Sequence, residues 1–284
     1  MGHKLRRKAF RAQSAMEYLM TYGWAILIIA IVMVALFALG IFNSTNFAPK
    51  ATAGACQVVR NVESVTLQGQ CQGELPMYVA LLNGQNSVIT PPSLFASSGV
   101  CNLTITGWSY DAGMPSTGQM AGVIGLSSNG WADIEYRDDV LRFELRNLSA
   151  GNSWTVYGNY KNTWVFTALV LTNGVATGGY INNNFYPSGH YIGCIGLTNS
   201  KIGSWDRAFN GYLSNIQVYN TSLSSNDLNS LYRAGIGGAP IDPLHIVGWW
   251  PLNGNTNDYS GNGHTSTQAA VSYTSSWTYG YNYP

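Results

Sequence analysis

The sequence RAQSAMEYLMTYGWAILIIAIVMVALFALGIF (residues 11–42) separates two parts of the chain with different character. It joins a basic segment, a short polar segment with one glutamate, and an uninterrupted apolar run over residues 25–42. As an α-helix at about 1.5 Å per residue, this run is roughly 27 Å long, close to the hydrocarbon thickness of a bilayer. Because the run is apolar on every side, we expect a long hydrophobic helix that lies in lipid or among other apolar helices.

The order of these parts differs from an ordinary secretory signal, in which a cleavage site of small residues directly follows an apolar core of about 7–15 residues. Basic residues and a small residue ahead of a polar segment and a retained apolar run resemble the class III signal of archaeal type IV pilins. The resemblance implies cleavage by a prepilin peptidase between Ala12 and Gln13. It also makes Glu17 the fifth mature residue, where these pilins carry a glutamate. Archaellins share the leader type but usually lack this glutamate.

Glu17 also has a physical role in this reading. A carboxylate in the first turn of a helix is stabilised by the helix dipole by about 0.3–1 kcal/mol, whereas an unpaired charge among apolar helices is costly. The pilin resemblance supplies a partner, the α-amino group of Gln13 on the same or a neighbouring subunit, and so gives Glu17 a role in assembly. The alternative is a glutamate at the membrane interface beside an aromatic belt of Tyr18, Tyr22 and Trp24.

The composition indicates an exported β protein. Only 10% of the 284 residues are charged, against about 25% in ordinary domains, and Gly, Asn, Ser, Thr and Tyr are abundant. The basic residues of the leader are Lys4, Arg6, Arg7, Lys8 and Arg11. They predict a membrane-anchored precursor with a cytoplasmic N-terminus and everything after Asn43 outside. The chain from residue 13 has 9 basic and 13 acidic residues, which excludes an electrostatic nucleic-acid site.

Cysteines and glycosylation sequons agree with an extracellular location. Three disulfide pairings are open for Cys56, Cys71, Cys101 and Cys194. We favour Cys56–Cys71, which closes a short loop, and by elimination Cys101–Cys194. No close CxxC spacing supports a zinc site. Four N-x-S/T sequons are candidates for N-glycans and begin at Asn43, Asn102, Asn147 and Asn220.

After a polar linker over residues 43–55, short apolar or alternating runs are separated by Gly, Asn and Ser. This spacing predicts an all-β antiparallel sandwich or barrel. The expected strands are residues 77–82, 87–90, 103–108, 122–126, 141–145, 164–171, 191–197, 212–219 and 246–250. One helix is expected over residues 224–234, where Ser224 can cap the first turn and Asp227 complements it.

Three segments resemble laminin-G-like, concanavalin-type jelly rolls. MYVALLNGQNSVITPPS (77–93) is similar to the strands that follow the opening strand of that family. FNGYLSNIQVYNTSLSSNDLNSLYRAG (209–235) is similar to the closing strand and helix of that family, and HIVGWWPLNGNTNDYSGNGHTST (245–267) to its opening strand. The opening strand thus comes last, which implies a circularly permuted domain, since the first and last strands of a jelly roll are neighbours. The alternative is that 245 onward begins a second, truncated repeat, but so short a segment cannot bury a sheet face alone.

Catalytic motifs are weak. Glucanases of the concanavalin-type fold carry Glu-x-Asp-x-Glu on one strand, whose carboxylates share a face. Here the corresponding triplet is Trp131, Asp133 and Glu135, so Trp131 replaces the nucleophile. We therefore expect no enzyme activity, and expect Asp133 and Glu135 to be polar residues on a solvated sheet face. The four histidines are scattered, without an HExxH motif.

Ligand sites are suggested by two further patterns. Asn255, Asn257, Asp258 and Asn262 form an oxygen-rich loop of the kind that holds Ca²⁺ in laminin-G-like domains, although Asn215 stands where that family often has an Asp. The alternative is an Asn/Gly turn whose side chains bond their own backbone. Aromatic residues late in the chain offer either a sugar-stacking surface or core and subunit contacts; they are Trp249, Trp250, Tyr273, Trp277, Tyr279, Tyr281 and Tyr283.

Together these patterns predict a leader (1–12), a hydrophobic pilin helix with its linker (13–48) and a jelly-roll domain (49–284). The predicted function is a structural, adhesive subunit of a type IV pilus-like filament, whose helix forms the core of a homopolymer and whose jelly roll is exposed. Its partners would be further copies of itself, the membrane before assembly, the pilus assembly machinery and surface glycans. The alternative is a membrane-tethered or tip lectin that does not polymerise in bulk, and a surface hydrolase is disfavoured by Trp131.

Overall fold

The structure is a computed structural model that describes residues 6–38, 50–51, 57–60, 65–68, 74–96, 99–113, 118–148 and 153–284. For residues 6–19, 21, 51, 57–60, 65–68, 153–157 and 159 only the backbone is described. The chain divides into two units, Met1–Ala48 and Pro49–Pro284, which we describe separately.

The first unit is built on a single helix, α1 (Arg6–Ala38). Its large apolar side chains from Met20 to Phe37 are mostly exposed in the isolated chain, including Trp24 and Ile29. No helix in the described part of the chain combines the length and apolar character needed to cross a membrane, so the predicted transmembrane helix is not found there. Ala12, Gln13 and Glu17 fall where only the backbone of α1 is described, and their roles stay predictions.

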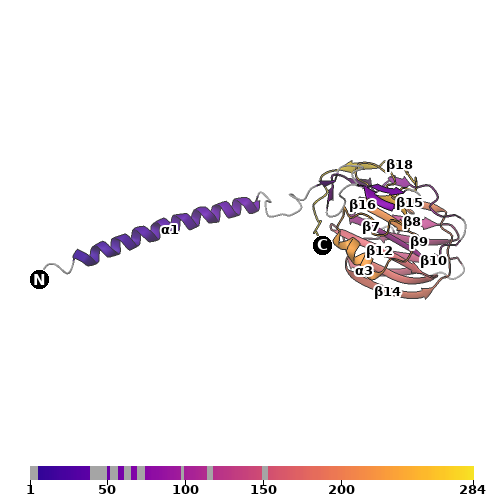
Figure 1. Ribbon diagram of the computed structural model, residues 1–284, viewed down its shortest axis with the longest axis horizontal. Helices are drawn as coiled ribbons and strands as arrows, with labels where there is room; N and C mark the ends of the chain where they lie inside the picture. Colours follow the sequence, from indigo (N-terminus) through magenta and orange to yellow (C-terminus); the bar gives the residue numbers. More distant parts are fainter. Residues whose placement is uncertain are drawn as a thin grey trace. The chain divides into compact units, whose positions relative to one another are not determined.

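The second unit is an antiparallel β-sandwich, consistent with the predicted jelly roll (Figure 1). One sheet has seven strands in the spatial order β11 (Ser153–Asn159), β10 (Val140–Asn147), β9 (Gly130–Arg137), β8 (Met120–Ser127), β15 (Asn199–Ile202), β6 (Val88–Thr90) and β18 (Thr267–Ala269). The other sheet has the order β14 (Asn184–Tyr191), β13 (Val175–Ile181), β12 (Trp164–Thr172), β7 (Leu103–Asp111), β16 (Asn210–Tyr219), β5 (Val79–Asn83) and β19 (Ser272–Thr274), and β17 (Ile246–Trp250) also pairs with β16.

Four short strands complete the second unit. β1 (Lys50–Ala51) pairs in parallel with β4 (Leu75–Pro76), and β2 (Gln57–Arg60) forms a hairpin with β3 (Val65–Gln68).

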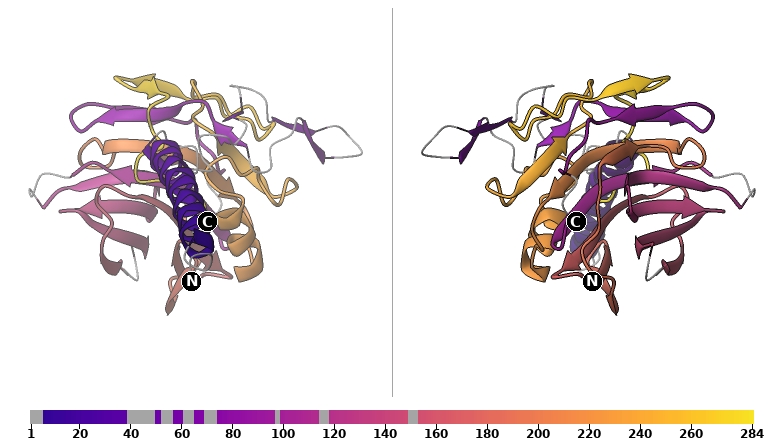
Figure 2. Two further views of the ribbon diagram at one scale, coloured as in Figure 1. Left: turned by 90° about the vertical axis from the view of Figure 1, so that its left-hand side faces the viewer. Right: turned by 90° about the vertical axis from the view of Figure 1, so that its right-hand side faces the viewer.

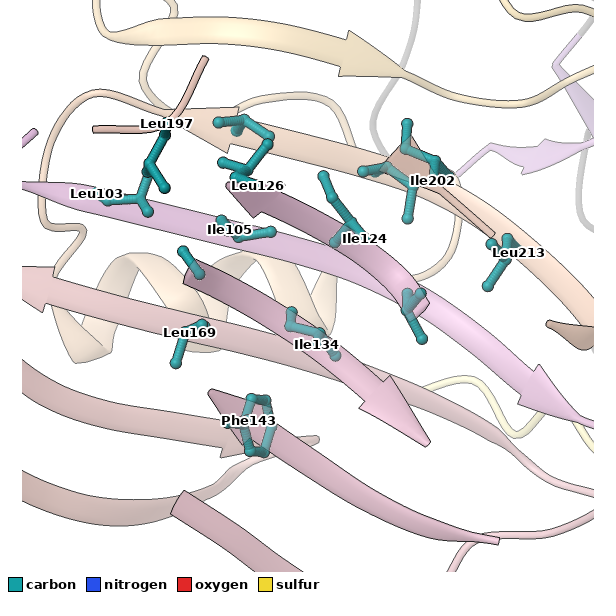
Figure 3. Packing of buried hydrophobic residues seen from close by; sticks show 14 of the residues in the cluster. Leu103, Ile105, Ile124, Leu126, Ile134, Phe143, Leu169, Leu197, Ile202 and Leu213 are labelled. Atoms are coloured by element: carbon teal, nitrogen blue, oxygen red, sulfur yellow. The ribbon is translucent and has the colours of Figure 1, made fainter. Parts of the chain in front are cut away.

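The core lies between the two large sheets and follows from alternation along the strands. Figure 3 shows Ile105 of β7 and Leu169 of β12 among Ile124 of β8, Ile134 of β9 and Phe143 of β10. All five side chains are 0–1% exposed. Every second residue of β8, β9 and β10 therefore points to the opposite, outer face of the seven-stranded sheet.

The outer face of the other sheet is covered. Helix α3 (Ser225–Arg233) has Ser224 as its N-cap, as predicted, and Ser224 also forms a capping box with Asp227. Tyr232 of this helix stacks on Trp108 of β7, with 6.1 Å between ring centroids. Tyr281, from the C-terminal segment, meets the same indole edge-on. The helix and the C-terminal segment thus bury the aromatic outer side of β7.

The predicted strand at residues 191–197 is wrong. Strand β14 ends at Tyr191, and the following residues make only an isolated bridge between Ile195 and Val100. Gly193, at φ 73°, turns the chain out of an extended path. The segment is held by the Cys101–Cys194 disulfide, which is present as predicted.

The C-terminal residues complete the sandwich. Strand β17 pairs antiparallel with β16, with Trp250 opposite Ile216, and Trp249 and Trp250 are buried. In Figure 2 the yellow strand β18 lies along the purple strand β6, and β19 pairs with β5. The predicted pairing of residues 245–267 with the closing strand, which a permuted opening strand requires, is confirmed.

Candidate functional site

A row of four residues crosses the outer face of the seven-stranded sheet. Strand register places Lys201 of β15 opposite Gly125 of β8, Gly125 opposite Asp133 of β9, and Asp133 opposite Glu144 of β10. Because directly opposed residues of neighbouring strands point to the same face, the row runs from a cation, past a position without a side chain, to two carboxyl groups.

A groove of about 430 Å³ opens at the cationic end of this row. Its lining is mostly small, hydroxyl and amide residues, with one indole and one ammonium group: Thr90, Pro91, Ser93, Gly125, Ser127, Thr198, Asn199, Ser200, Lys201 and Trp205. Volumes of about 300–1,000 Å³ are typical of small-ligand sites. The groove can therefore hold one or two rings of a polar ligand.

Two prolines create the groove. Strand β6 ends at Thr90, directly before Pro91 and Pro92, and prolines have no N–H with which to continue the ladder. The hydroxyl of Ser200 donates to both proline carbonyl groups, at 3.1 Å each. The chain therefore stays tethered beside β15 without pairing to it, which leaves the space that the groove occupies.

Trp205 forms one wall of the groove and is held by a tight loop. The loop leaves β15 at Gly203, whose φ of 76° and contact with Leu82 leave no room for a side chain. The backbone N–H groups of Asp206 and Arg207 both donate to the carbonyl of Met120. A Cβ atom at position 125 would lie 2.7 Å from the Trp205 ring and 2.9 Å from Oδ1 of Asp133. Gly125 is thus the residue that lets the indole pack closely on β8.

The carboxyl groups behind Trp205 are buried, which corrects the expected solvated face. Asp133 and Glu135 are 1% and 0% exposed, and Glu144 is 7% exposed. The reason is the loop that carries Trp205, which lies over the outer side of β8 where Gly122 and Gly125 leave room. Alternation correctly places these residues on the outer face, but that face is covered at this position.

Burial raises the pKa of Asp133 and of Glu135. The pKa of Asp133 is raised well above its usual value by burial and then by Glu135 and Glu144, and the Leu126 backbone and Arg142 do not cancel the effect. Burial also raises the pKa of Glu135 to about 7, against the ion pair with Arg142 at 3.1 Å. Among the described residues, no side chain hydrogen-bonds to either oxygen of Asp133. Burial thus favours the neutral form of both carboxyl groups.

Trp131 lies on the same outer face but outside the groove. The guanidinium of Arg146, its cross-strand partner, lies 5.0 Å from the centre of the indole ring. Trp131, the residue that stands at the glucanase nucleophile's place in the sequence pattern, is thus engaged in a cation–π pair.

The predicted calcium loop is held by its own hydrogen bonds. Oδ1 of Asp258 accepts from the backbone N–H groups of Trp249 and Ser260, and Oδ2 accepts from the Ser260 hydroxyl and the His264 backbone N–H. Oδ1 of Asn255 accepts from the N–H of Asn257. The described residues contain no cluster of three or more His, Cys, Asp or Glu side chains suited to a metal. Calcium binding stays a prediction.

Asn215, the other residue of that prediction, is a buried structural group. Its Nδ2 donates to the carbonyl of Gly238, and its Oδ1 accepts from Trp249 Nε1 at 2.8 Å and from Gln217 Nε2.

The sequons differ in accessibility. Nδ2 of Asn147, the atom that a glycan would need, donates to the carbonyl of Ile192 at 3.0 Å, and Oδ1 of Asn102 accepts from the N–H of Asn173. Asn220 is exposed, and its side chain forms no hydrogen bond with the described residues. Asn43 lies outside the described residues, as do Cys56 and Cys71.

The late aromatic residues differ in exposure, since Tyr279 and Tyr283 are exposed whereas others of the set are buried. Trp277 is fully buried and meets Trp164 edge-on, and Tyr281 is also buried. The groove residues Lys201 and Trp205 were missed by the sequence analysis. The sequence signals for this region were Gly122 and Gly125 of β8. Glycines within a strand often mark the close approach of another segment.

No protein-family model matches the sequence, and no curated protein is significantly similar to it. Several solved structures are similar to the sandwich. A putative carbohydrate-binding protein from Bacteroides ovatus has 16% sequence identity and a TM-score of 0.54, over 76% of this chain and 65% of that chain. A heptameric SAP-like pentraxin from Limulus polyphemus has 13% identity and a TM-score of 0.46, over 69% of this chain and 94% of that chain.

Domain 4 of an extracellular arabinanase from Geobacillus stearothermophilus, solved with arabinotriose, has 16% identity and a TM-score of 0.42, over 62% of this chain and 81% of that chain. The first likeness establishes a shared β-sandwich fold, and this chain spans less than two thirds of that protein's length. The expectation that the chain is not an enzyme stays a prediction.

Proposed function

We propose that the sandwich is a non-enzymatic glycan-binding domain and that the groove beside Trp205 is its binding site. The observation that carries this proposal is the combination of one partly exposed indole with hydroxyl and amide groups around a volume of about 430 Å³. A sugar ring has an apolar C–H face, which packs on an aromatic ring, and a rim of hydroxyl groups, which needs hydrogen-bond partners. The fold shared with the Bacteroides ovatus protein supports the same conclusion.

The test is glycan-array binding followed by calorimetry with the Trp205→Ala variant. We expect at least a tenfold loss of affinity for any sugar that the wild-type domain binds, because the stacking surface is removed. The matched control is Trp131→Ala, which deletes an indole from the same sheet face but outside the groove. Unchanged affinity of Trp205→Ala, with the loss appearing in Trp131→Ala instead, would move the site away from the groove.

We also propose that the whole chain is a subunit of a type IV pilus-like filament on an archaeal surface. The support is the order of basic leader, small residue, Gln13 and Glu17 ahead of the apolar run, together with a helix whose apolar side chains are exposed in the isolated chain. Packing against the same helix of further copies would bury these side chains. The precursor would be membrane-anchored, processed by a prepilin peptidase and moved outside by the assembly machinery.

The position of the mature N-terminus tests this second proposal. Mass spectrometry of surface material should find a mature chain that begins at Gln13, whereas a start at Met1 or near Gly54 would contradict it. Electron microscopy of the same fraction separates the filament subunit from the alternative, a tethered or minor tip lectin. Bulk filaments built from this chain are expected for the first and not for the second.

A further inference from the structure

Lys201 is a cation without a partner in the part of the chain that the structure describes. It lies on β15 with an exposed side chain that forms no ion pair or hydrogen bond. Lys161, another lysine of the sandwich, is instead paired with Asp139 at 3.2 Å. Among the described residues, Lys201 is also the only charged one that lines the groove. In a chain with so few charges, an unpaired ammonium group inside a binding groove needs an explanation.

The register of the sheet shows why Lys201 is not neutralised from within. Asp133 lies in the same cross-strand row, two strands away and on the same face. Two strand spacings amount to roughly 9–10 Å, a distance that a lysine side chain could largely cover. The indole of Trp205 packs on Gly125 between them, within 2.7 Å of where a Cβ atom would stand. Trp205 therefore separates the row into an open cationic side and a buried acidic side.

The acidic side has its own cation. Arg142 forms an ion pair with Glu135 and is the positive group that acts on Asp133, while Glu144 lies opposite Asp133 on β10. None of these groups lines the groove. A ligand in the groove thus meets one positive charge, an aromatic surface, hydroxyl and amide groups, and no carboxylate.

We propose that the groove selects a sugar that carries an anionic group, and that Lys201 is the residue that determines this specificity. The apolar face of the ring would pack on Trp205, the anion would pair with Lys201, and the hydroxyl rim would meet the Ser, Thr and Asn side chains. A uronic acid carboxylate and a sulfate ester share this chemistry. This inference rests on the glycan-binding function proposed above and names the class of glycan.

The experiment compares matched sugars on the full sandwich domain. The probes are short glucuronate, galacturonate and mannuronate oligosaccharides, the methyl ester of each, and a sulfated galactose series. Calorimetry at low salt should show at least one anionic probe bound about tenfold or more tightly than its uncharged counterpart. Raising the salt should weaken that binding and leave the ester unaffected, because exposed charge pairs are screened.

Variants assign the effect to Lys201. Lys201→Gln should lower the affinity for the anionic probe about tenfold, to that of the methyl ester, and leave the affinity for the ester unchanged. Lys201→Arg should retain most of the preference. Lys161→Gln is the control, since it removes a lysine from the same domain outside the groove.

The outcomes separate this inference from the proposed function. Equal affinity for charged and esterified probes, or an unchanged preference in Lys201→Gln, overturns the anionic specificity. If Trp205→Ala still abolishes binding in that case, glycan binding at the groove stands. If the wild-type domain binds none of the probes and no glycan on a broad array, both proposals fail. Tighter binding of a sulfate or of a carboxylate supports the inference either way and identifies the anion.

Discussion

At the scale of single residues, the buried acids of β9 make the stability of the sandwich depend on pH. Glu135 is fully buried and its pKa is raised to about 7, whereas a glutamate in an unfolded chain titrates near 4.3. The folded domain therefore holds a proton that the unfolded chain releases between these values. Linkage then requires that stability falls as pH rises through this window.

We predict that this contribution to the free energy of unfolding is fully present below about pH 4.3 and falls progressively as the pH rises to about 7. For Glu135 the loss is about 3–4 kcal/mol, and Asp133, whose pKa is raised as well, acts in the same direction. Urea unfolding followed by fluorescence at several pH values measures the effect. Glu135→Gln, which resembles the protonated acid, should flatten part of the slope.

The control for this series is Asp138→Asn. Asp138 is exposed on the turn between β9 and β10 at φ 51°, a conformation that Asn tolerates. This substitution should leave the pH dependence unchanged. A flat profile in the wild type, or an equal slope in Glu135→Gln, would contradict the assignment.

At the scale of elements, the C-terminal segment after β19 stabilises the eight-stranded sheet from outside. Its anchor is Trp277, which is fully buried between Trp164 and Tyr281. The carbonyl of Trp277 also accepts the indole N–H of Trp164 at 2.9 Å. The segment thus acts as part of the core rather than as a tail.

We expect Trp277→Ala to destabilise the domain by about 3–5 kcal/mol, the range for buried Trp or Phe truncated to Ala. Tyr279, two residues away on the same segment, is 79% exposed, and Tyr279→Ala should change stability by no more than about 0.5 kcal/mol. Denaturant unfolding of both variants provides the comparison. Similar midpoints for the two would mean that the segment does not anchor the sheet.

The elements that sequence could predict are those in which a local pattern decides the outcome. The runs over residues 141–145 and 164–171 became strands because one face packs into the core. Ser224 and Asp227 formed the capping box because cap and partner are three residues apart. The groove could not be predicted in the same way. Thr90, Gly125 and Lys201 come from strands far apart in sequence, and alternation does not tell whether a loop such as that of Trp205 covers a face.

At the scale of the whole chain, α1 and the sandwich would have separate tasks in the proposed filament. The helix carries an exposed apolar surface, and the sandwich carries the groove. We predict that Glu17→Gln is still processed but assembles poorly, because it removes a charge partner and leaves the cleavage site intact. Filament yield by electron microscopy, with the mature N-terminus checked by mass spectrometry, measures this. A normal yield would count against a pairing role for Glu17.

The strand order of the sandwich has a consequence for how the protein is made. The backbone N–H of Tyr78 donates to Asn253, 175 residues later, and the hydroxyl of Ser87 donates to the carbonyl of Ala270, 183 residues later. Since the ribosome delivers the N-terminal strands first, β5 and β6 emerge long before the strands that flank them, and such distant pairings form slowly. The nascent chain therefore cannot complete the sandwich until translation has passed these late strands. An unfolded, extended chain is also the form that a protein-conducting channel can accept.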